Sequence, residues 1–262
     1  SMPPVPDLLY NYVCHHFPEH QIAVVFEIGC CGFWAAREML NYGWQVMVVN
    51  PGDIKRSDKH RYQKTDVIDC RHLSRQLQKE ELQGIHIPTE EQEQLLLLLR
   101  QRNHITKLLR KQKSVIKASL LYSGIRIPEA YDNPNWSHAF IDWLKSLSWS
   151  YAPGKESLHS KLRILEVLHK EYLGVANQLR AWCRKHHKKD YYLLKSIPGI
   201  GGYLAAAVLA ELGDLRRFSN ERQLSNYIGL VPGIYQSDES SKLLGRTPRS
   251  RSLLRSYIIE AS

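Results

Sequence analysis

Lys64-Thr65-Asp66-Val67-Ile68-Asp69 is the stretch from which the fold can be worked out. Its threonine is a favourable helix N-cap, and apolar residues recur at helical spacing through Leu73 and Leu77. Asp66 and Asp69 stand three residues apart, so both carboxylates lie on one face of the first helical turn. Acids in that position either complement the helix dipole or, with a third acid, bind a divalent cation.

The sequence upstream predicts one β-α-β unit that supplies the third acid. Residues 22–26 form an apolar, β-branched run of strand length, and residues 46–49 form a second one. Between them, residues 32–42 have a helical pattern that ends at Gly43. Glu27 directly follows the first strand, and ligand groups of an open α/β sheet gather at the carboxyl ends of its strands. Glu27 is therefore expected to lie near the two aspartates.

The charge of the chain favours a polyanionic partner. The 262 residues are 43% hydrophobic, enough for one large core or two modest ones, and carry a formal net charge of +10. A clustered basic excess of this kind favours nucleic acid over a small metabolite. No apolar run approaches the ~18 residues of a membrane span, so no membrane partner is expected. The five cysteines form no CxxC and no zinc spacing, which predicts reduced thiols in a cytoplasmic compartment.

Two long helices are predicted in the middle of the chain. A capped helix runs from Thr89 to about Leu121, and a second covers residues 155–187, with an aromatic-rich connector between them. Together they predict an antiparallel helical hairpin. The basic residues in it either contact nucleic acid or form an ordinary solvated face. The predicted contacts are Arg100, Arg102, Lys107, Arg110, Lys111, Lys113, Lys117, Arg184, Lys185, Lys188 and Lys189.

The C-terminal part contains a glycine-rich turn between two helical segments. Residues 196–201, Ser-Ile-Pro-Gly-Ile-Gly, have the form of a helix-hairpin-helix, in which Gly199 and Gly201 let backbone N–H groups approach a phosphate. A plain tight turn is the alternative. Further on, a polar loop at residues 233–248 holds Ser237, Ser240 and Ser241. The arginines beside it, predicted to bind phosphates, are Arg246, Arg249 and Arg251.

Five segments, in this order and spacing, resemble the IS110/IS1111 transposases. They are Phe26-Glu27-Ile28-Gly29-Cys30-Cys31-Gly32-Phe33-Trp34, Val48-Val49-Asn50-Pro51, Lys64-Thr65-Asp66-Val67-Ile68-Asp69, Ser196-Ile197-Pro198-Gly199-Ile200-Gly201 and Tyr227-Ile228-Gly229-Leu230-Val231-Pro232. The resemblance implies an α/β plus all-α chain. Residues 1–86 are then a partial RuvC-like (RNase H-type) α/β domain, residues 87–190 a long antiparallel coiled-coil segment, and residues 191–262 a mostly helical C-terminal transposase domain with the helix-hairpin-helix.

The resemblance also implies roles for individual residues. The second, third and fourth acids of the family's DEDD set fall on Glu27, Asp66 and Asp69, and its nucleophilic serine falls on Ser237. The usual Ser-Gly is Ser-Asp here, and the distance to Gly245 is one residue longer, which leaves the two neighbouring serines of the loop open as alternatives. The first acid of the family lies on a strand for which this sequence offers only Asp7, in a helical pattern. The chain is therefore interpreted as trimmed at both ends.

The function implied by the resemblance is that of an insertion-sequence DNA transposase or recombinase. It would cut and rejoin DNA with Mg²⁺ (or Mn²⁺) on the acid cluster and a nucleophilic serine. Its expected partners are DNA, a bridging noncoding RNA and further copies of itself, as a dimer or tetramer, in the bacterial cytoplasm and associated with the nucleoid. One alternative is a non-catalytic nucleic-acid-binding protein derived from a transposase.

A second alternative is an S-adenosylmethionine-dependent methyltransferase. Residues 25–32 resemble its first motif, in which glycines after a strand make room for the cofactor. Two features weaken this reading. Cys31 occupies a position usually held by glycine, and the next strand ends at Asn50 where an acid would be expected to bind ribose hydroxyls.

Overall fold

The computed structural model describes residues 5–54, 65–132, 136–231, 234–237, 240–243 and 252–261. The chain divides into two compact units, Ser1–Glu90 and Glu91–Ser262. The first boundary lies close to the one predicted after residue 86. The further division at residue 191 stays a prediction. Each unit is described by itself below.

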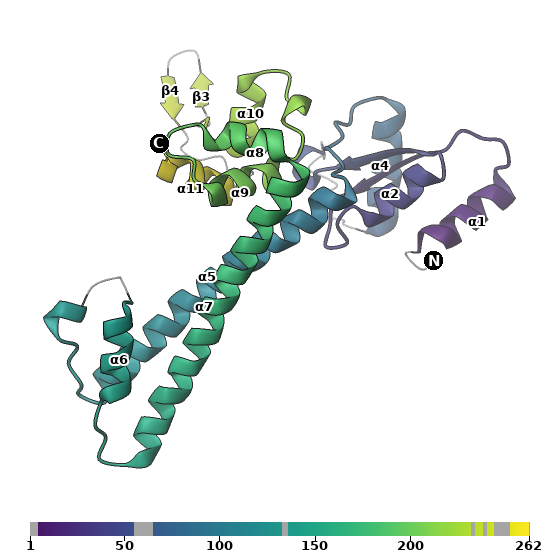
Figure 1. The fold of residues 1–262 in the computed structure, drawn as a ribbon. Coiled ribbons are helices and arrows are strands. Elements are labelled where there is room, and N and C mark those ends of the chain that lie inside the picture. The colour runs from purple at the N-terminus through teal and green to yellow at the C-terminus, as the bar shows by residue number, and fades with distance from the viewer. Residues whose placement is uncertain are drawn as a thin grey trace. The chain divides into compact units, whose positions relative to one another are not determined.

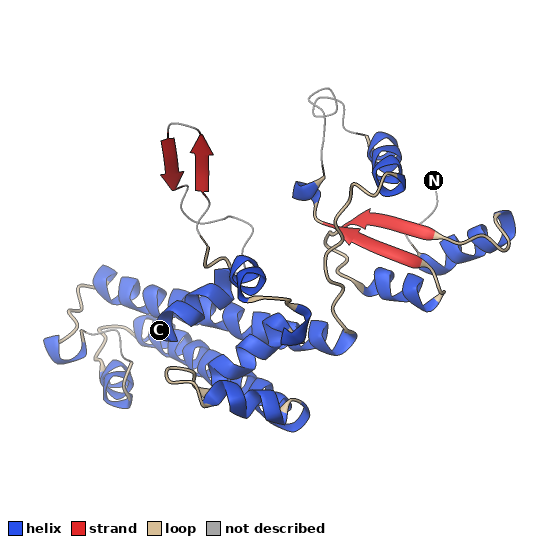
Figure 2. Cartoon of the chain, turned by 90° about the horizontal axis from the view of Figure 1, so that it is seen from above, coloured by secondary structure: helices blue, strands red, loops and turns tan. Residues whose placement is uncertain are grey.

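The first unit is built around two parallel strands (Figure 2). Its elements are α1 (Pro6–His16), β1 (Ala23–Glu27), α2 (Trp34–Asn41), β2 (Gln45–Val49), a 3-10 turn (Pro51–Asp53) and α4 (Asp66–Gln78). β1 and β2 pair from Ala23 opposite Gln45 to Glu27 opposite Val49. The predicted β-α-β unit is confirmed, with its helix beginning two residues later than expected, after the turn at residues 30–33.

β2 is the inner strand of this unit because it has backbone partners on both sides. β1 pairs with one edge, and on the other edge the N–H of Ile85 donates to the carbonyl oxygen of Val48 at 2.7 Å. The small core beneath consists of Val49, Ile54 and Leu73, which joins α4 to the sheet. The burial of Val49, only 1% exposed, explains why this strand is a continuous apolar run in the sequence.

The second unit is helical apart from a short β-hairpin (Figure 1). Its helices are α5 (Glu90–Tyr122), α6 (His138–Ser146), α7 (Ala152–His186), α8 (Lys188–Lys195), α9 (Gly202–Leu212), α10 (Glu221–Ile228) and α11 (Ser252–Ala261), with 3-10 turns at Glu129–Tyr131 and Leu215–Arg217. β3 (Ile234–Ser237) and β4 (Ser240–Leu243) are antiparallel. The polar loop predicted at 233–248 therefore contains two strands. The prediction was wrong there because this polar stretch has no apolar alternation to indicate a strand.

α5 and α7 form the predicted helical hairpin and bury two separate cores along it. Leu158, Leu162 and Leu165 of α7 are buried near the α6 end, and Leu179 and Cys183 near the other end, in a spacing of threes and fours. At the α6 end they pack with Phe140 and Leu144, among others. At the other end the partners are residues of α8 and α9, including Tyr191, Ala205 and Ala206. The hairpin is thus held by a different group of helices at each end.

Aromatic residues of the α5–α7 connector pack inward. The rings of Phe140 and Trp143 stack with centres 5.7 Å apart, and the ring of Trp136 meets that of Phe140 edge-on at 5.0 Å. Trp149 lies against the backbone of Gly154, where a side chain would collide with the indole. Such ring pairs stabilise beyond their buried area.

Candidate active site and nucleic-acid interface

The first turn of α4 carries two of the three predicted acids. Oγ1 of Thr65 accepts a hydrogen bond from the N–H of Ile68 at 3.4 Å, and Thr65 has the extended backbone of an N-cap. The predicted cap is therefore confirmed. Asp66 is exposed and Asp69 is half-buried, so both carboxylates are accessible from the solvent side of this turn.

Glu27 and the first turn of α4 lie at the same end of the sheet. Glu27 is the last residue of β1 and is half-buried. At the opposite end of the strands, a cavity of about 460 Å³ is lined both by strand residues Ala23, Gln45 and Met47 and by the last turns of α4, through Ser74, Leu77 and Gln78. Since the end of α4 meets the beginning of the strands, α4 runs antiparallel to them. Its beginning is therefore directed toward the edge where Glu27 stands.

The three acids do not form a closed metal cage. Within the described part of the chain, no three His, Cys, Asp or Glu side chains stand close enough together to hold a metal ion. Their oxygen donors fit Mg²⁺ or Mn²⁺ by type, and an open site is what those ions use with phosphate substrates. A joint metal role for Glu27, Asp66 and Asp69 stays a prediction.

Asp7, the residue offered for the first acid of the family, has a structural partner at the end of α2. The hydroxyl of Tyr42 donates to Oδ1 of Asp7, and this bond raises the pKa of Tyr42 to about 12. Asp7 therefore links α1 to the residue that follows α2.

The candidate nucleophiles share one β-hairpin. Ser237 is the last residue of β3 and pairs with Ser240, the first residue of β4, while Ser241 pairs with Gln236. The three serines are thus close neighbours along two adjoining strands, which leaves the choice among them open. The predicted phosphate-binding arginines Arg246, Arg249 and Arg251 lie outside the described residues.

Three of the seven predicted basic residues of α5 share one side of the helix. Arg100, Lys107 and Lys111 are exposed, and at about 100° per residue they fall within a sector of roughly 40°, opposite the buried stripe. We call these three residues the basic face. Arg110 is exposed beside it. Lys117 lies further round, and its Nζ is 3.3 Å from a carboxylate oxygen of Asp132. At the other predicted cluster, Arg184, Lys185, Lys188 and Lys189 are all exposed.

Arg102 does not belong to the basic face. Its guanidinium lies over the rings of Tyr172 at 4.5 Å and Tyr203 at 4.1 Å, and donates to the hydroxyls of Tyr172 at 2.5 Å and Tyr257 at 3.1 Å. Burial also raises the pKa of Tyr203 far above its ordinary value. The structure thus corrects the prediction of an exposed contact. The spacing Leu95, Leu99, Arg102 places this arginine on the buried stripe, a pattern from which its role could have been inferred.

The glycine-rich turn joins α8 to α9, as predicted. Gly199 has φ of 83°, the left-handed region in which glycine is favoured, and Gly201 is the N-cap of α9 with φ of −75°. A side chain at Gly199 would collide with the carbonyl oxygen of Ala261 in α11, whereas the space beside Gly201 is open. The backbone and packing at position 199 therefore favour glycine for a structural reason that is independent of nucleic acid. The role of both glycines as phosphate contacts stays a prediction.

Family models match both the N-terminal and the C-terminal part of the chain. A family model for DEDD-type IS110 transposases matches residues 7–123, which include the acids, the cap and the basic face. A second family model, described as transposase IS116/IS110/IS902 family, matches residues 191–262, which include the glycine-rich turn and the serines. The chain belongs to the IS110 transposase family.

Several known transposases resemble the chain along nearly all of it. It is 26% identical to the transposase for insertion sequence element IS1111A of Coxiella burnetii and 27% identical to that for IS1328 of Yersinia enterocolitica, matching 90% and 91% of this chain. It is also 26% identical to a protein of Sinorhizobium fredii provisionally named transposase y4qE. The chain spans 57%, 65% and 70% of the lengths of y4qE and of the IS1111A and IS1328 transposases, respectively.

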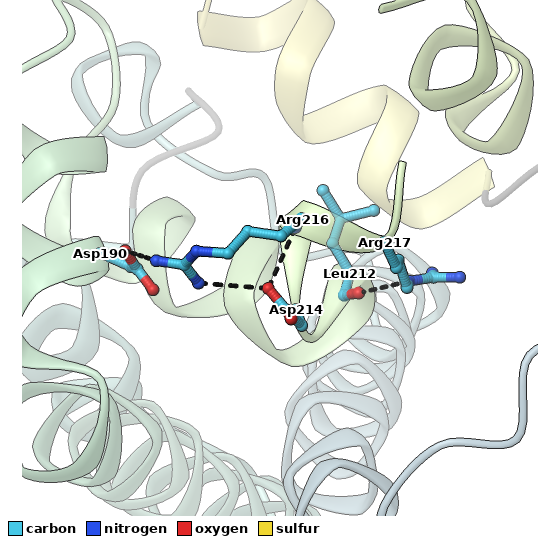
Figure 3. Close-up of polar contacts among 5 residues, drawn as sticks. All are labelled: Asp190, Leu212, Asp214, Arg216 and Arg217. Atoms are coloured by element: carbon cyan, nitrogen blue, oxygen red, sulfur yellow. Dashed lines mark hydrogen bonds and ion pairs between the residues drawn. The ribbon is translucent and has the colours of Figure 1, made fainter. Parts of the chain in front are cut away.

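Two arginines of this IS110-family chain were not predicted as structural residues. Figure 3 shows Arg216 held by Asp214, at 3.2 Å, and by Asp190 of α8, at 3.6 Å. Nε of Arg217 donates to the carbonyl oxygen of Leu212 at 3.1 Å, and its guanidinium lies 4.2 Å from the centre of the Phe218 ring. Arg216 thus ties the segment after α9 to α8, and Arg217 ties it to the end of α9, so part of the C-terminal positive charge is used internally. None of the described helices is long and apolar enough to cross a membrane.

Proposed function

We propose that this chain is the catalytic part of an insertion-sequence transposase that cuts and rejoins DNA strands. The observation that carries the proposal is the arrangement at one sheet edge. There Glu27 ends β1 and the capped turn with Asp66 and Asp69 begins α4. The family membership supports the same conclusion and sets the methyltransferase alternative aside.

The acids would hold Mg²⁺ or Mn²⁺, which supplies Lewis-acid activation of a phosphodiester. Ser237 would act as the nucleophile. Its hydroxyl oxygen forms a bond to the DNA phosphorus, the bond from phosphorus to one sugar oxygen breaks, and the serine proton goes to the departing hydroxyl. Attack by another strand's hydroxyl on the same phosphorus reverses the step and releases the serine. Arg246, Arg249 and Arg251 would neutralise charge that develops on the phosphate oxygens.

The proposed partners are DNA, a bridging noncoding RNA and further copies of the chain as a dimer or tetramer, in the bacterial cytoplasm and near the nucleoid. The resemblance to the IS110/IS1111 transposases supports these partners. On this chain, the basic face and the exposed cluster Arg184, Lys185, Lys188 and Lys189 would contact the phosphates. Because the basic face lies on one side of α5, it fits a nucleic-acid backbone that runs along the hairpin.

A second candidate is a nucleic-acid-binding protein without catalysis. The observation in its favour is that the described acids form no group of three close enough for a metal. In that case the basic face would bind nucleic acid while the sheet edge had no chemical role.

The experiment that separates the two uses Mn²⁺ and two of the three acids. Calorimetric titration of the chain, alone and with DNA, should show Mn²⁺ binding that Glu27→Gln and Asp69→Asn each weaken about tenfold or more. Glu38→Gln, on α2, is the matched control and should leave binding unchanged. Equal Mn²⁺ binding by all four proteins would favour the non-catalytic candidate.

The serine is tested in a protein extended to the length of the relatives. Ser237→Ala should abolish covalent protein–DNA adducts on denaturing gels and leave RNA binding intact. Loss of adducts in Ser240→Ala or Ser241→Ala instead would move the nucleophile to that serine. Adducts in all three variants would remove serine chemistry from the mechanism.

A further inference from the structure

A cavity of about 290 Å³ opens between α5, α6 and α7, where Figure 1 shows α6 beside the end of the hairpin. Its floor is apolar, formed by Leu109 of α5 and by Leu162 and Leu165 of α7, all buried. Protein interiors pack at a density near ~0.75 and leave few voids larger than a water molecule. An open space of this size above a packed leucine floor is therefore suited to a guest with an apolar face.

One wall of the cavity combines an aromatic ring with a cation. Trp136 lines it and is fixed from behind by its edge-on contact with Phe140. Nζ of Lys113 lies 5.5 Å from the centre of the Trp136 ring. Partial burial lowers the pKa of Lys113 below its ordinary value. A flat, heteroaromatic guest could stack on the indole here while the ammonium group donates to its ring acceptors.

The rim of the cavity offers both hydrogen-bond acceptors and donors. Asp142 of α6 and Glu166 of α7 line it and are exposed. His138 and Lys145, four and three residues from Asp142 on the same helix face, add donors. A ring that carries amino groups and carbonyl or imine acceptors on one edge matches this set.

A row of basic residues leads from the basic face to the cavity. Lys107, Arg110 and Lys113 are spaced by three residues, so each step turns by about 60° around α5. The row begins on the exposed face at Lys107, passes Arg110 and ends at the cavity wall with Lys113. A strand with successive phosphates on Lys107 and Arg110 would deliver the next nucleotide to the cavity mouth.

We propose that this cavity holds one unstacked nucleobase of a single-stranded RNA or DNA segment that runs along α5. The base stacks on Trp136, and its amino group donates to Asp142 or Glu166. Bases with an exocyclic amino group therefore bind better than uracil or thymine. The inference rests on the proposed nucleic-acid-binding function of the hairpin, and adds to it a base-selective site.

The test compares labelled single-stranded dodecamers of cytidine, of uridine and of abasic nucleotides, bound to the full chain and followed by fluorescence anisotropy at one salt concentration. The cytidine strand should bind about tenfold more tightly than the uridine strand. Trp136→Ala should weaken cytidine binding by about tenfold or more, to near the level of the abasic strand. Asp142→Asn combined with Glu166→Gln should make the cytidine and uridine affinities equal.

Two controls distinguish base recognition from phosphate binding. Tyr151→Ala removes a ring that is 81% exposed and outside the cavity lining, and should change nothing. Lys107→Ala should weaken all three strands by the same factor. Because the loss of Trp136 could unsettle the Phe140 cluster, Trp136→Phe and the exposed carboxylate pair provide tests that keep the packing.

The possible failures are distinguishable. Salt-dependent binding with equal affinity for cytidine, uridine and abasic strands would overturn the base site and leave the proposed function standing. Absence of salt-dependent binding to any strand would overturn both.

Discussion

The guanidinium of Arg102 lies 4.1 Å from the centre of the Tyr203 ring, so a basic residue in the middle of α5 is held by the first turn of α9. The hydroxyls of Tyr203 and Tyr257 are 3.1 Å apart, and Tyr257 also accepts from Arg102. Four residues from α5, α7, α9 and α11 thus meet at one point. This point joins the hairpin to the C-terminal helices.

Replacement of Arg102 should therefore destabilise the second unit without weakening nucleic-acid binding. Arg102→Met keeps the length of the side chain but removes two hydrogen bonds and two ring contacts, a loss of about 1–3 kcal/mol of unfolding free energy. Urea denaturation measures it. Lys107→Ala is the matched control and should leave stability within about 0.5 kcal/mol. Unchanged stability in Arg102→Met would mean that the contacts of Arg102 with the tyrosines contribute nothing to the free energy of unfolding.

Loss of the basic face should change the salt dependence of binding. Arg100→Ala, Lys107→Ala and Lys111→Ala should each reduce the slope of log affinity against log salt by about one, because each removes one phosphate contact. Titrations of a duplex between low and moderate salt give the slope. Lys155→Ala and Lys170→Ala, exposed on the mixed-charge surface of α7, are the controls. Equal slopes in all five variants would make the face ordinary surface.

The two glycines of the α8–α9 turn should respond differently to alanine. Gly199→Ala forces a side chain into left-handed backbone and against the carbonyl of Ala261, at a cost of about 1–3 kcal/mol. Gly201→Ala meets open space at φ of −75° and should be close to neutral. Thermal denaturation of the two variants checks this. Similar melting temperatures for both would contradict the contact with α11.

The N-cap of α4 should influence the acids it precedes. Thr65→Ala removes the bond to the N–H of Ile68 and should cost about 1 kcal/mol of stability. Fraying of that turn should also weaken Mn²⁺ binding severalfold, although the threonine is not a proposed ligand. Thr65→Ser keeps a hydroxyl and should restore both properties. A loss of stability with unchanged Mn²⁺ affinity would separate the cap from the site.

The sequence predicted those parts of the fold that hydrophobic periodicity and helix-capping residues encode locally. The apolar runs gave both parallel strands, Thr65 gave the start of α4, and leucine spacing gave the two long helices. Arg102 was misjudged because its partners come from three helices that lie 70 to 155 residues away in the sequence. The pairing of Ser237 with Ser240 was also missed, since a polar hairpin has no hydrophobic alternation.

The acid site could be predicted as a set of residues but not as a geometry. A strand end and the capped start of a helix that follows the β-α-β unit indicate a shared sheet edge, and the antiparallel course of α4 agrees with this. The distances among Glu27, Asp66 and Asp69 depend on side-chain orientations and on neighbouring chain that local patterns do not encode.

The hairpin is anchored in one core near α6 and in another near α9, and Arg102 interrupts the leucine stripe between them. Helices of 33 and 35 residues extend roughly 50 Å at 1.5 Å per residue. Such a pair is stiff along its length, and Arg102 is a polar contact between its two apolar cores. A nucleic-acid strand bound at one end of the hairpin would bend it or tilt it at Arg102. That movement would strain the hydrogen bonds of Arg102 first.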